Sequence, residues 1–420
     1  MKFKIYTLGC KVNSYESQFY MEQLEKIGFT YTEDIADLYI INTCTVTNTA
    51  ASKSRQKIHL AKKENPESIV VVIGCYAQCI DDKKREELHA DIIIGAQYKS
   101  EIASIIQAYI QTNQKRDYVS SSSSFDTFEM MPIHQFESKL RAFLKVEDGC
   151  NQFCSYCTIP FARGRERSLD KDKVISIAGD LCDKGHKEIV LTGIHTGRYM
   201  SNGTNLTGLL KELIANTPED VYYRISSIEI TEVNDELIDL MKNNPRICHH
   251  LHIPIQSGCD ATLKRMNRPY NLFEFKERLN HIRHEITDIS ISTDIIVGFV
   301  QESEEEFNQT YNTLLECQFS FLHVFPYSKR DGTKASLMKG EVEGSLKKKR
   351  VNKVLSLSKM LRIKDMERYK EIEVLIETHK GNIYTGYTNQ YHPVEIQSDI
   401  PLEGRIKLSW NEIKNGTYCL

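Results

Sequence analysis

The chain has 420 residues, of which 40% are hydrophobic and 26% are charged, and this globular composition is enough for two or three domains with sizeable cores. Its formal net charge of −3 excludes a polycation, so contacts with nucleic acid require a local basic face. Twelve cysteines, with no export signal and no apolar run of about 18 residues, predict a cytoplasmic protein without a membrane span whose thiols serve metal or redox chemistry.

The first part of the chain alternates short apolar strands with helical patterns. Strands are predicted at KFKIYTLG, ADLYIIN, SIVVVIG and ADIIIG, and helices at 14–27, at 48–64 and after the last strand. Such alternation is typical of a doubly wound parallel sheet, which we assign to residues 1–115.

One cysteine follows each of the first three strands, at Cys10, Cys44 and Cys75. Ligands of open parallel sheets bind beyond the carboxyl ends of the strands, so three thiols from three loops are expected to meet at one metal site. The alternative for each cysteine alone is a small buried packing residue. Cys79, four residues after Cys75, is either a further ligand or a spare buried thiol.

Residues 116–139 have low complexity and contain the run SSSSS. This composition predicts a flexible linker between two domains.

A second β/α pattern occupies residues 140–368. Six strands are predicted, at AFLKVE, EIVLTGI, YYRISSIEI, HLHIPIQ, ISISTDIIVG and FSFLHVFPY, and helical stretches separate them. This pattern predicts a central partial (β/α)6 barrel.

The last part of the chain begins with a basic helix from about 345 to 369. Its lysines and arginines form either a solvated face or a contact to RNA phosphates. Residues 369–420 change to short strands with glycine and asparagine turns, which predict a small β-barrel at the C-terminus.

Three further cysteines, Cys150, Cys154 and Cys157, follow the first strand of the central domain. Soft thiolates select iron–sulfur clusters, zinc or Cu(I). A zinc finger needs a fourth ligand nearby, but the next cysteine is Cys182, and His195 is a remote candidate. The ligand set is therefore incomplete.

This C-x3-C-x2-C motif resembles that of the radical S-adenosylmethionine (SAM) superfamily. TLGCKVNSYES, NTCTVTNTAASKSR and GCYAQ resemble the N-terminal motifs of its methylthiotransferase family, whereas DGCNQFCSYCTIPFARGRERS, LTGIHTGRY, HIPIQSGCDATLKRMNRPY, STDIIVGF and FPYSKRDGTKA resemble its radical SAM core. The tail is similar to a TRAM domain. TLGCKVN and RISSIEI resemble the branch that modifies N6-threonylcarbamoyladenosine at position 37 of tRNA.

The resemblance implies SAM and two [4Fe–4S] clusters. Cys150, Cys154 and Cys157 would hold one cluster, whose fourth iron SAM chelates, and Cys10, Cys44 and Cys75 would hold an auxiliary cluster that carries sulfur. One SAM donates a methyl group and another yields the 5′-deoxyadenosyl radical that attacks carbon 2 of the adenine. No catalytic acid or base is expected, because that C–H bond is too weakly acidic for proton abstraction.

The resemblance also implies residues that contact SAM and the substrate. The expected SAM contacts are Thr192, Gly193, Ser226, Glu229 and Asp294. The substrate side chain carries a carboxylate, which arginine binds bidentately, and the candidates in the loop after the cysteines are Arg163, Arg165 and Arg167. The alternative is that this loop is merely exposed and basic.

The implied partners are the anticodon loop of tRNA, an electron donor such as flavodoxin or ferredoxin, and a sulfur donor. Two alternatives within the family modify N6-isopentenyladenosine in tRNA or an aspartate of a ribosomal protein. A third reading is a non-enzymatic iron–sulfur or zinc protein that binds RNA, which two incomplete ligand sets disfavour because structural metals are normally fully ligated.

Overall fold

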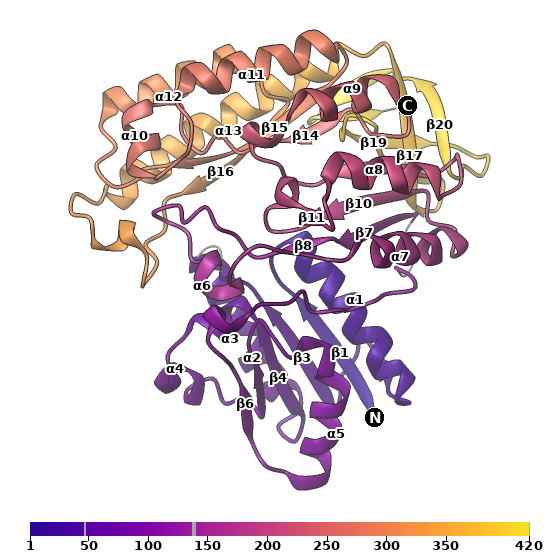
Figure 1. The fold of residues 1–420 in the computed structure, drawn as a ribbon, viewed down its shortest axis with the longest axis vertical. Helices are drawn as coiled ribbons and strands as arrows, with labels where there is room; N and C mark the ends of the chain where they lie inside the picture. The colour runs from indigo at the N-terminus through magenta and orange to yellow at the C-terminus, as the bar shows by residue number, and fades with distance from the viewer. Residues whose placement is uncertain (46–47, 137–139, 420) are drawn as a thin grey trace.

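The computed structural model describes residues 1–45, 48–136 and 140–419. Its N-terminal part is one parallel sheet in the order β2-β1-β3-β4-β5-β6 (Figure 1). The strands are β1 (Lys2–Thr7), β2 (Thr30–Tyr31), β3 (Leu38–Thr43), β4 (Ile69–Gly74), β5 (Ile92–Ile94) and β6 (Arg116–Tyr118).

Helices cover both faces of this sheet because its strands are apolar on both sides. Ile40 and the residues on its face pack with α1 (Lys11–Lys26) and α5 (Ile102–Thr112). Ile41 and its face pack with α2 (Asn48–Glu64) and α3 (Cys75–Cys79), and the short α4 (Asp82–Glu86) follows. The N-terminal part is thus an α/β layer structure with a parallel sheet.

The described part of residues 116–139 differs from the flexible linker that its composition predicts. Its first residues form β6, which pairs with β5, and Met131 and Ile133 are buried in the main core. The Tyr15 hydroxyl donates to the Met131 carbonyl at 2.7 Å. The serine-rich composition concealed these anchors, because burial of isolated apolar residues depends on tertiary packing. Residues 137–139 lie outside the described residues.

All six strands predicted for the central domain are present, in two parallel three-stranded sheets. The first sheet has the order β13-β10-β7 and the second the order β14-β15-β16. Tyr223 of β13 forms an isolated parallel bridge with Ile247, just before β14. The strands are β7 (Arg141–Lys145), β10 (Glu188–Thr192), β13 (Tyr222–Ile225), β14 (His250–His252), β15 (Ser290–Val297) and β16 (Phe321–Pro326).

Helices between these strands cover the outer faces of the sheets (Figure 1). The longer ones are α7 (Lys171–Asp183), α8 (Leu206–Ala215), α9 (Asp235–Asn243), α11 (Leu272–Glu285) and α12 (Glu304–Cys317). Shorter elements near the carboxyl ends are α6 (Ile159–Arg163), α10 (Asp260–Arg265), the paired strands β8 (Glu147–Asp148) and β9 (Arg167–Ser168), and the hairpin β11 (Met200–Ser201) with β12 (Thr204–Asn205).

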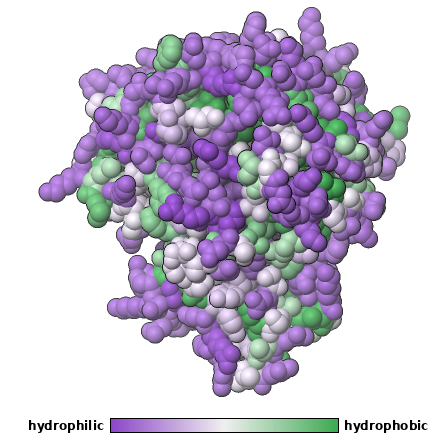
Figure 2. Space-filling model, viewed as in Figure 1, coloured by the Kyte–Doolittle hydropathy of each residue, from purple (hydrophilic) through white to green (hydrophobic). Residues whose placement is uncertain are grey.

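The basic helix α13 (Gly344–Met366) packs on the outside of β16. Val354, Leu357 and Leu361 face the core, and the Leu322 amide donates to the Ser358 hydroxyl at 3.0 Å. Its exposed lysines include Lys348, Lys349, Lys353, Lys359 and Lys364. Hydrophilic residues cover most of the face seen in Figure 2.

The C-terminal part is a sheet in the order β20-β17-β18-β19-β22-β21, antiparallel except between β19 and β22. Its strands are β17 (Glu371–Lys380), β18 (Ile383–Thr388), β19 (Pro393–Gln397), β20 (Arg405–Ser409), β21 (Glu412–Lys414) and β22 (Thr417–Cys419). None of the described helices has both the length and the apolar character that crossing a membrane requires.

Buried charges join the C-terminal sheet to the first sheet of the central domain. Glu188, fully buried on β10, binds Arg224 at 2.7 Å, Arg141 at 2.9 Å and Arg405 at 3.1 Å. Because Arg405 lies on β20, this one carboxylate connects the two parts.

Candidate active site

The N-terminal cysteines come together because their strands are neighbours in the sheet. Thr43 pairs with Gly74 across β3 and β4, so Cys44 and Cys75, the next residues along the chain, emerge side by side. The side-chain amide of Asn13 donates to the Thr43 carbonyl at 3.1 Å and to the Leu8 carbonyl at 2.7 Å, which holds the Cys10 loop against them.

Gly9 permits this close approach. Its φ is +107°, and a Cβ at this position would lie 2.6 Å from the Cβ and 2.8 Å from the Sγ of Cys44. Only glycine fits such a backbone at such a distance. The loop is therefore shaped to bring Cys10 and Cys44 together.

The second triplet lies in the loop between β8 and α6. Gly149, at φ +91°, starts the loop, and the Cys150 amide donates to the Gly164 carbonyl at 3.0 Å. The Gln152 amide points to the Cys150 sulfur at 3.4 Å, and the Ile159 amide points to the Cys157 sulfur at the same distance. The Arg268 guanidinium donates to the Cys154 sulfur at 3.3 Å.

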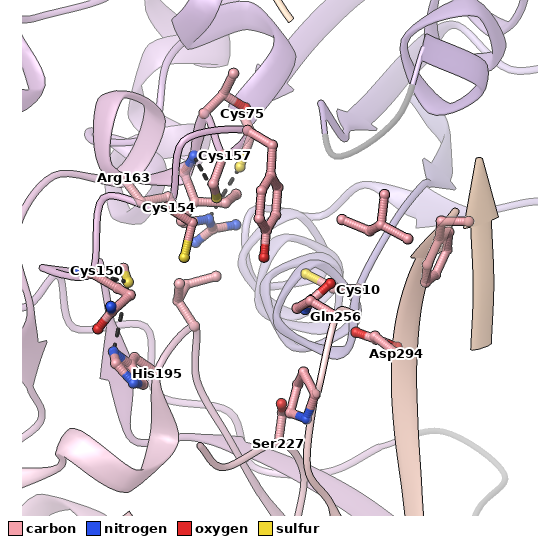
Figure 3. Close-up of a pocket in the computed structure, with 18 of the residues that line it drawn as sticks. Cys10, Cys75, Cys150, Cys154, Cys157, Arg163, His195, Ser227, Gln256 and Asp294 are labelled. Atoms are coloured by element: carbon pink, nitrogen blue, oxygen red, sulfur yellow. Dashed lines mark hydrogen bonds between the residues drawn. The ribbon is translucent and has the colours of Figure 1, made fainter. Parts of the chain in front are cut away.

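All six cysteines line one cavity of about 380 Å³. Figure 3 shows the sulfur atoms of Cys10, Cys75, Cys150, Cys154 and Cys157 around a common space, although the two triplets come from different parts of the chain. A group held by one triplet therefore faces a group held by the other.

The donor set fits iron–sulfur clusters better than single zinc ions. A tetrahedral zinc holds thiolates at about 2.3 Å, so three bound sulfurs lie within about 4 Å of one another. Among the described residues, the only group of three or more metal-binding side chains within single-ion reach is Cys150, Glu166 and His195. Neither cysteine triplet is that tightly packed, as a larger cluster requires.

Burial raises the pKa of the Cys157 thiol to about 12. A thiol in such surroundings stays protonated unless a bound metal stabilises the thiolate. Together with the amide and guanidinium donors that point at these sulfurs, this indicates a site that is complete only with its metal.

The expected SAM residues divide between two adjoining chambers. Gly193, Glu229 and Asp294 line the cysteine cavity. Thr192 and Ser226 line a second chamber of about 420 Å³, which Gly193 and Asp294 share. The Glu229 carboxylate is paired with Arg268, the residue that contacts Cys154.

The three candidate arginines have different surroundings. Arg163 is 1% exposed, and its guanidinium donates to Glu16, Asp148, Asn13 and the Cys75 sulfur, the last at 3.1 Å. Arg167 donates to the carbonyls of Phe125, Arg163 and Arg165. Arg163 is thus committed within the protein, and so is Nη1 of Arg167, whose buried Nε has no hydrogen-bond partner among the described residues. Arg165, in contrast, is exposed and stacks over the Phe153 ring at 4.6 Å.

The sequence indicated His195 as a remote metal-ligand candidate but did not indicate the carboxylates that surround it. Its Nδ1 lies 3.0 Å from Glu166 and 3.6 Å from the Cys150 sulfur, and its Nε2 lies 2.7 Å from Glu232. Burial alone would lower the pKa of His195, but its contacts with Cys150 and the two glutamates raise it to about 12. His195 is therefore cationic beside a cysteine of the second triplet.

Glu147 is a second residue that the sequence did not indicate. It is fully buried and accepts the His195 backbone amide at 2.6 Å, and burial raises its pKa to about 8. In the sequence, the pair of Glu147 and Asp148 directly before the cysteine loop was the only visible signal.

Cys79 ends α3, four residues after Cys75. It is not among the described residues that line the cysteine cavity. This placement favours a spare thiol over an additional ligand, but Cys79 is exposed and not buried as expected.

Known proteins match the chain over most of its length. Residues 2–95 match the family described as "Uncharacterized protein family UPF0004", and residues 144–314 match the Radical SAM superfamily. The "Threonylcarbamoyladenosine tRNA methylthiotransferase MtaB" of Bacillus subtilis is 41% identical over 412 residues, which is 96% of this chain and 91% of that protein.

Two other relatives are similarly complete. The protein of the same name from Aquifex aeolicus is 38% identical and covers 90% of this chain and 93% of its own. The "tRNA-2-methylthio-N(6)-dimethylallyladenosine synthase" of Thermodesulfovibrio yellowstonii is 33% identical and covers 94% of this chain and 93% of its own.

Solved structures share the fold at low identity. The radical SAM methyltransferase TsrM from Kitasatospora setae has a TM-score of 0.60 at 13% identity, over 80% of this chain and 75% of its own. The cobalamin-dependent radical SAM enzyme OxsB has a TM-score of 0.52 at 11% identity, over 88% of this chain and 56% of its own.

Proposed function

The chain belongs to the radical SAM methylthiotransferase family, and from this premise we propose that it adds a methylthio group to carbon 2 of N6-threonylcarbamoyladenosine at position 37 of tRNA. Five relatives, each 32–41% identical and covering at least 90% of the chain, carry the name of that activity. The observation that carries the proposal is the convergence of all six cysteines on one cavity.

SAM and [4Fe–4S] chemistry come with the radical SAM superfamily. We assign one cluster to Cys150, Cys154 and Cys157 and an auxiliary cluster to Cys10, Cys44 and Cys75. When bound, these groups supply one-electron cleavage of SAM, hydrogen-atom abstraction and a site that holds the incoming sulfur. The protein's own task is to hold both groups and the target carbon in one space that excludes water.

Two buried arginines donate hydrogen bonds to cysteine sulfurs and so help to hold the clusters. Arg268 donates to Cys154, and Arg163 donates to Cys75, each from a buried position. Donors aimed at cluster sulfurs stabilise the reduced, more negative cluster, because the added charge is felt strongly where the dielectric constant is low. The Glu229 carboxylate keeps Arg268 in place.

Within the cavity, we assign SAM to the wall that includes Gly193, Glu229 and Asp294, with Thr192 and Ser226 just beyond it. A Cβ at Gly193 would lie 2.7 Å from the Glu147 carboxylate, so glycine lets this wall pack closely against Glu147. Arg165 is exposed beside Phe153, and Phe161, 51% exposed, packs edge-on against the same ring. Exposed aromatic rings and arginine are suited to stacking with bases of the anticodon loop.

The remaining assignments follow from the family. We assign residues 1–115 to the auxiliary-cluster domain, residues 140–368 to a partial (β/α)6 radical SAM barrel and residues 369–420 to a TRAM-like β-barrel that binds tRNA. The exposed lysines of α13 add a basic face for the same ligand. An electron donor such as flavodoxin or ferredoxin, a sulfur donor and a cytoplasmic location complete the proposal.

Mass spectrometry of tRNA nucleosides tests the function. The reconstituted, anaerobic protein with SAM and a reductant is incubated with tRNA that carries threonylcarbamoyladenosine, and the methylthio derivative is the expected product. Methylthiolation only of tRNA that carries N6-isopentenyladenosine would favour the second branch of the family. Absence of both 5′-deoxyadenosine and product would leave the non-enzymatic reading.

A further inference from the structure

The second chamber adjoins the cysteine cavity. The two spaces share Cys10, Gly193, Ser227, Asp294 and Phe325. Figure 3 shows Cys10, Ser227 and Asp294 together at this junction. A nucleotide that reaches the cysteine cavity can therefore extend a substituent into the second chamber.

Lys11 is the only lysine or arginine among the described residues that line this chamber. It follows Cys10 directly and begins α1. Its ammonium lies 5.3 Å from the centre of the Tyr391 ring. This ammonium forms no hydrogen bond or ion pair with the described residues. Such a cation is available to an anionic ligand.

Among the described residues, the one carboxylate that lines the chamber does not compete for Lys11. Asp294 lies 3.2 Å from Nε2 of His252, and the other nitrogen of that ring lies 2.9 Å from the Ser292 hydroxyl. Asp294 is therefore already paired on its own sheet.

The rest of the lining supplies neutral polar groups. Thr192, Ser226 and Ser292 present hydroxyls, and the ring of His323 packs edge-on against that of His252. Burial lowers the pKa of His323 to about 4, so its ring is uncharged at neutral pH. The chamber thus combines one cation with several neutral hydrogen-bonding groups.

We propose that Lys11 binds the carboxylate of the amino-acid substituent on the target adenine, and that the second chamber is the specificity pocket for this substituent. The proposal rests on the proposed function and names the residue that reads its substrate. None of the three arginines expected to bind this carboxylate, Arg163, Arg165 and Arg167, is among the described residues that line the chamber. An uncharged isopentenyl group would leave Lys11 without a partner, which disfavours that substrate.

The test is the binding preference of the reconstituted holoprotein for two tRNAs that differ only in whether adenosine 37 carries the threonylcarbamoyl group. Lys11→Gln removes the charge, Lys11→Arg keeps it, and Lys26→Gln makes the same neutral change at the exposed far end of α1. A ratio of two affinities cancels any general effect of Lys11 on the neighbouring cluster.

Lys11→Gln is expected to reduce the preference about ten- to a hundredfold, as the loss of a hydrogen bond to a charged group predicts. Lys11→Arg and Lys26→Gln should keep it within a few-fold of the unaltered protein. An unchanged preference in Lys11→Gln would overturn the proposal, and so would its equal loss in Lys11→Arg.

A second measurement needs no variant. The unaltered protein is given tRNA in which the threonyl carboxylate is converted to the primary amide, and the same ten- to hundredfold loss of affinity is expected. If the protein bound both tRNAs equally and still methylthiolated the acid form, the role of Lys11 would be overturned but the proposed function would stand. Failure of the unaltered protein to methylthiolate the acid form would instead reject the proposed function and this inference together.

Discussion

At the scale of single residues, Arg163 connects the two halves of the site. Three buried cations, Lys99, Lys145 and Arg163, meet the two buried carboxylates of Glu16 and Asp148. Burial by itself would raise the pKa of Glu16, but Arg163 and the two lysines hold it well below its usual range. The excess positive charge lies beside Cys75, where it favours an anionic ligand.

Arg163→Met is expected to destabilise the apoprotein by about 2–3 kcal/mol, because Glu16, Asp148 and Asn13 lose buried hydrogen bonds while Lys99 and Lys145 still pair with the two carboxylates. Urea unfolding measures the loss. The matched control Arg85→Met removes an ion pair with Asp82, whose side chain is 90% exposed, and should cost less than about 1 kcal/mol. Equal losses in the two variants would show that the buried group is not stabilising.

Arg165 is an exposed candidate for contact with tRNA phosphates. Arg165→Ala is expected to weaken binding of tRNA with and without the threonylcarbamoyl group by the same factor, about three- to tenfold, and to lower the slope of affinity against salt by about one. Fluorescence anisotropy over a series of salt concentrations measures both. A loss confined to the modified tRNA would transfer the carboxylate contact from Lys11 to Arg165.

At the scale of elements, the loops after β1, β3 and β4 bring three cysteines to the end of one sheet. Parallel neighbouring strands place their carboxyl ends on one edge, so the positions of Cys10, Cys44 and Cys75 after three strands were a sufficient signal. The close contact that finishes the site, between Gly9 and Cys44, depends on backbone geometry that the sequence shows only as a glycine.

Gly9→Ala is expected to reduce iron in the reconstituted protein from about eight to about four per chain, because the added methyl group occupies the space of the Cys44 side chain. Gly28→Ala is the matched control, since its φ is +85° but nothing lies within 4 Å of the new Cβ. The control should keep about eight irons at a strain cost of about 1 kcal/mol. Full iron content in Gly9→Ala would argue against the auxiliary site.

At the scale of the whole molecule, Glu188 joins the central domain to the C-terminal sheet. Burial raises the pKa of Glu188, but Arg141, Arg224 and Arg405 together hold it well below its usual range. In the unfolded chain the pKa of a glutamate is about 4.3. Because the pKa of Glu188 is lower in the folded protein, its carboxylate stabilises the fold at pH values above about 4.3, and this stabilisation is lost as the pH falls from there toward the folded-state pKa.

Glu188→Gln should therefore cost about 3–5 kcal/mol at pH 7, and the difference from the unaltered protein should shrink as the pH falls from 5 toward 3. Thermal unfolding at several pH values measures this. Lys211 and Glu236 form an exposed pair, and Glu236→Gln should leave the stability within about 1 kcal/mol. A difference that does not vary with pH would contradict the role given to the Glu188 charge.

Sequence patterns were sufficient for features that repeat locally and insufficient for contacts between distant segments. Alternating strands and helices predicted the N-terminal parallel sheet and the six central strands. The partners of Arg163 come from three separate segments, α1, α3 and β8, and each charge alone resembles an ordinary surface residue. The serine run predicted a linker although Met131 and Ile133 are buried in the core, because two apolar residues form no periodic pattern that would indicate a buried element.

The central claim is that each cysteine triplet holds its own iron–sulfur cluster, so that two clusters share one cavity. Iron per chain, measured after anaerobic reconstitution in the unaltered protein and in two triple variants, tests it most directly. We expect about eight irons in the unaltered protein and about four when either Cys10, Cys44 and Cys75 or Cys150, Cys154 and Cys157 are replaced by alanine. About four irons in the unaltered protein with no loss in the Cys10, Cys44 and Cys75 variant, or zinc in place of iron, would contradict the account.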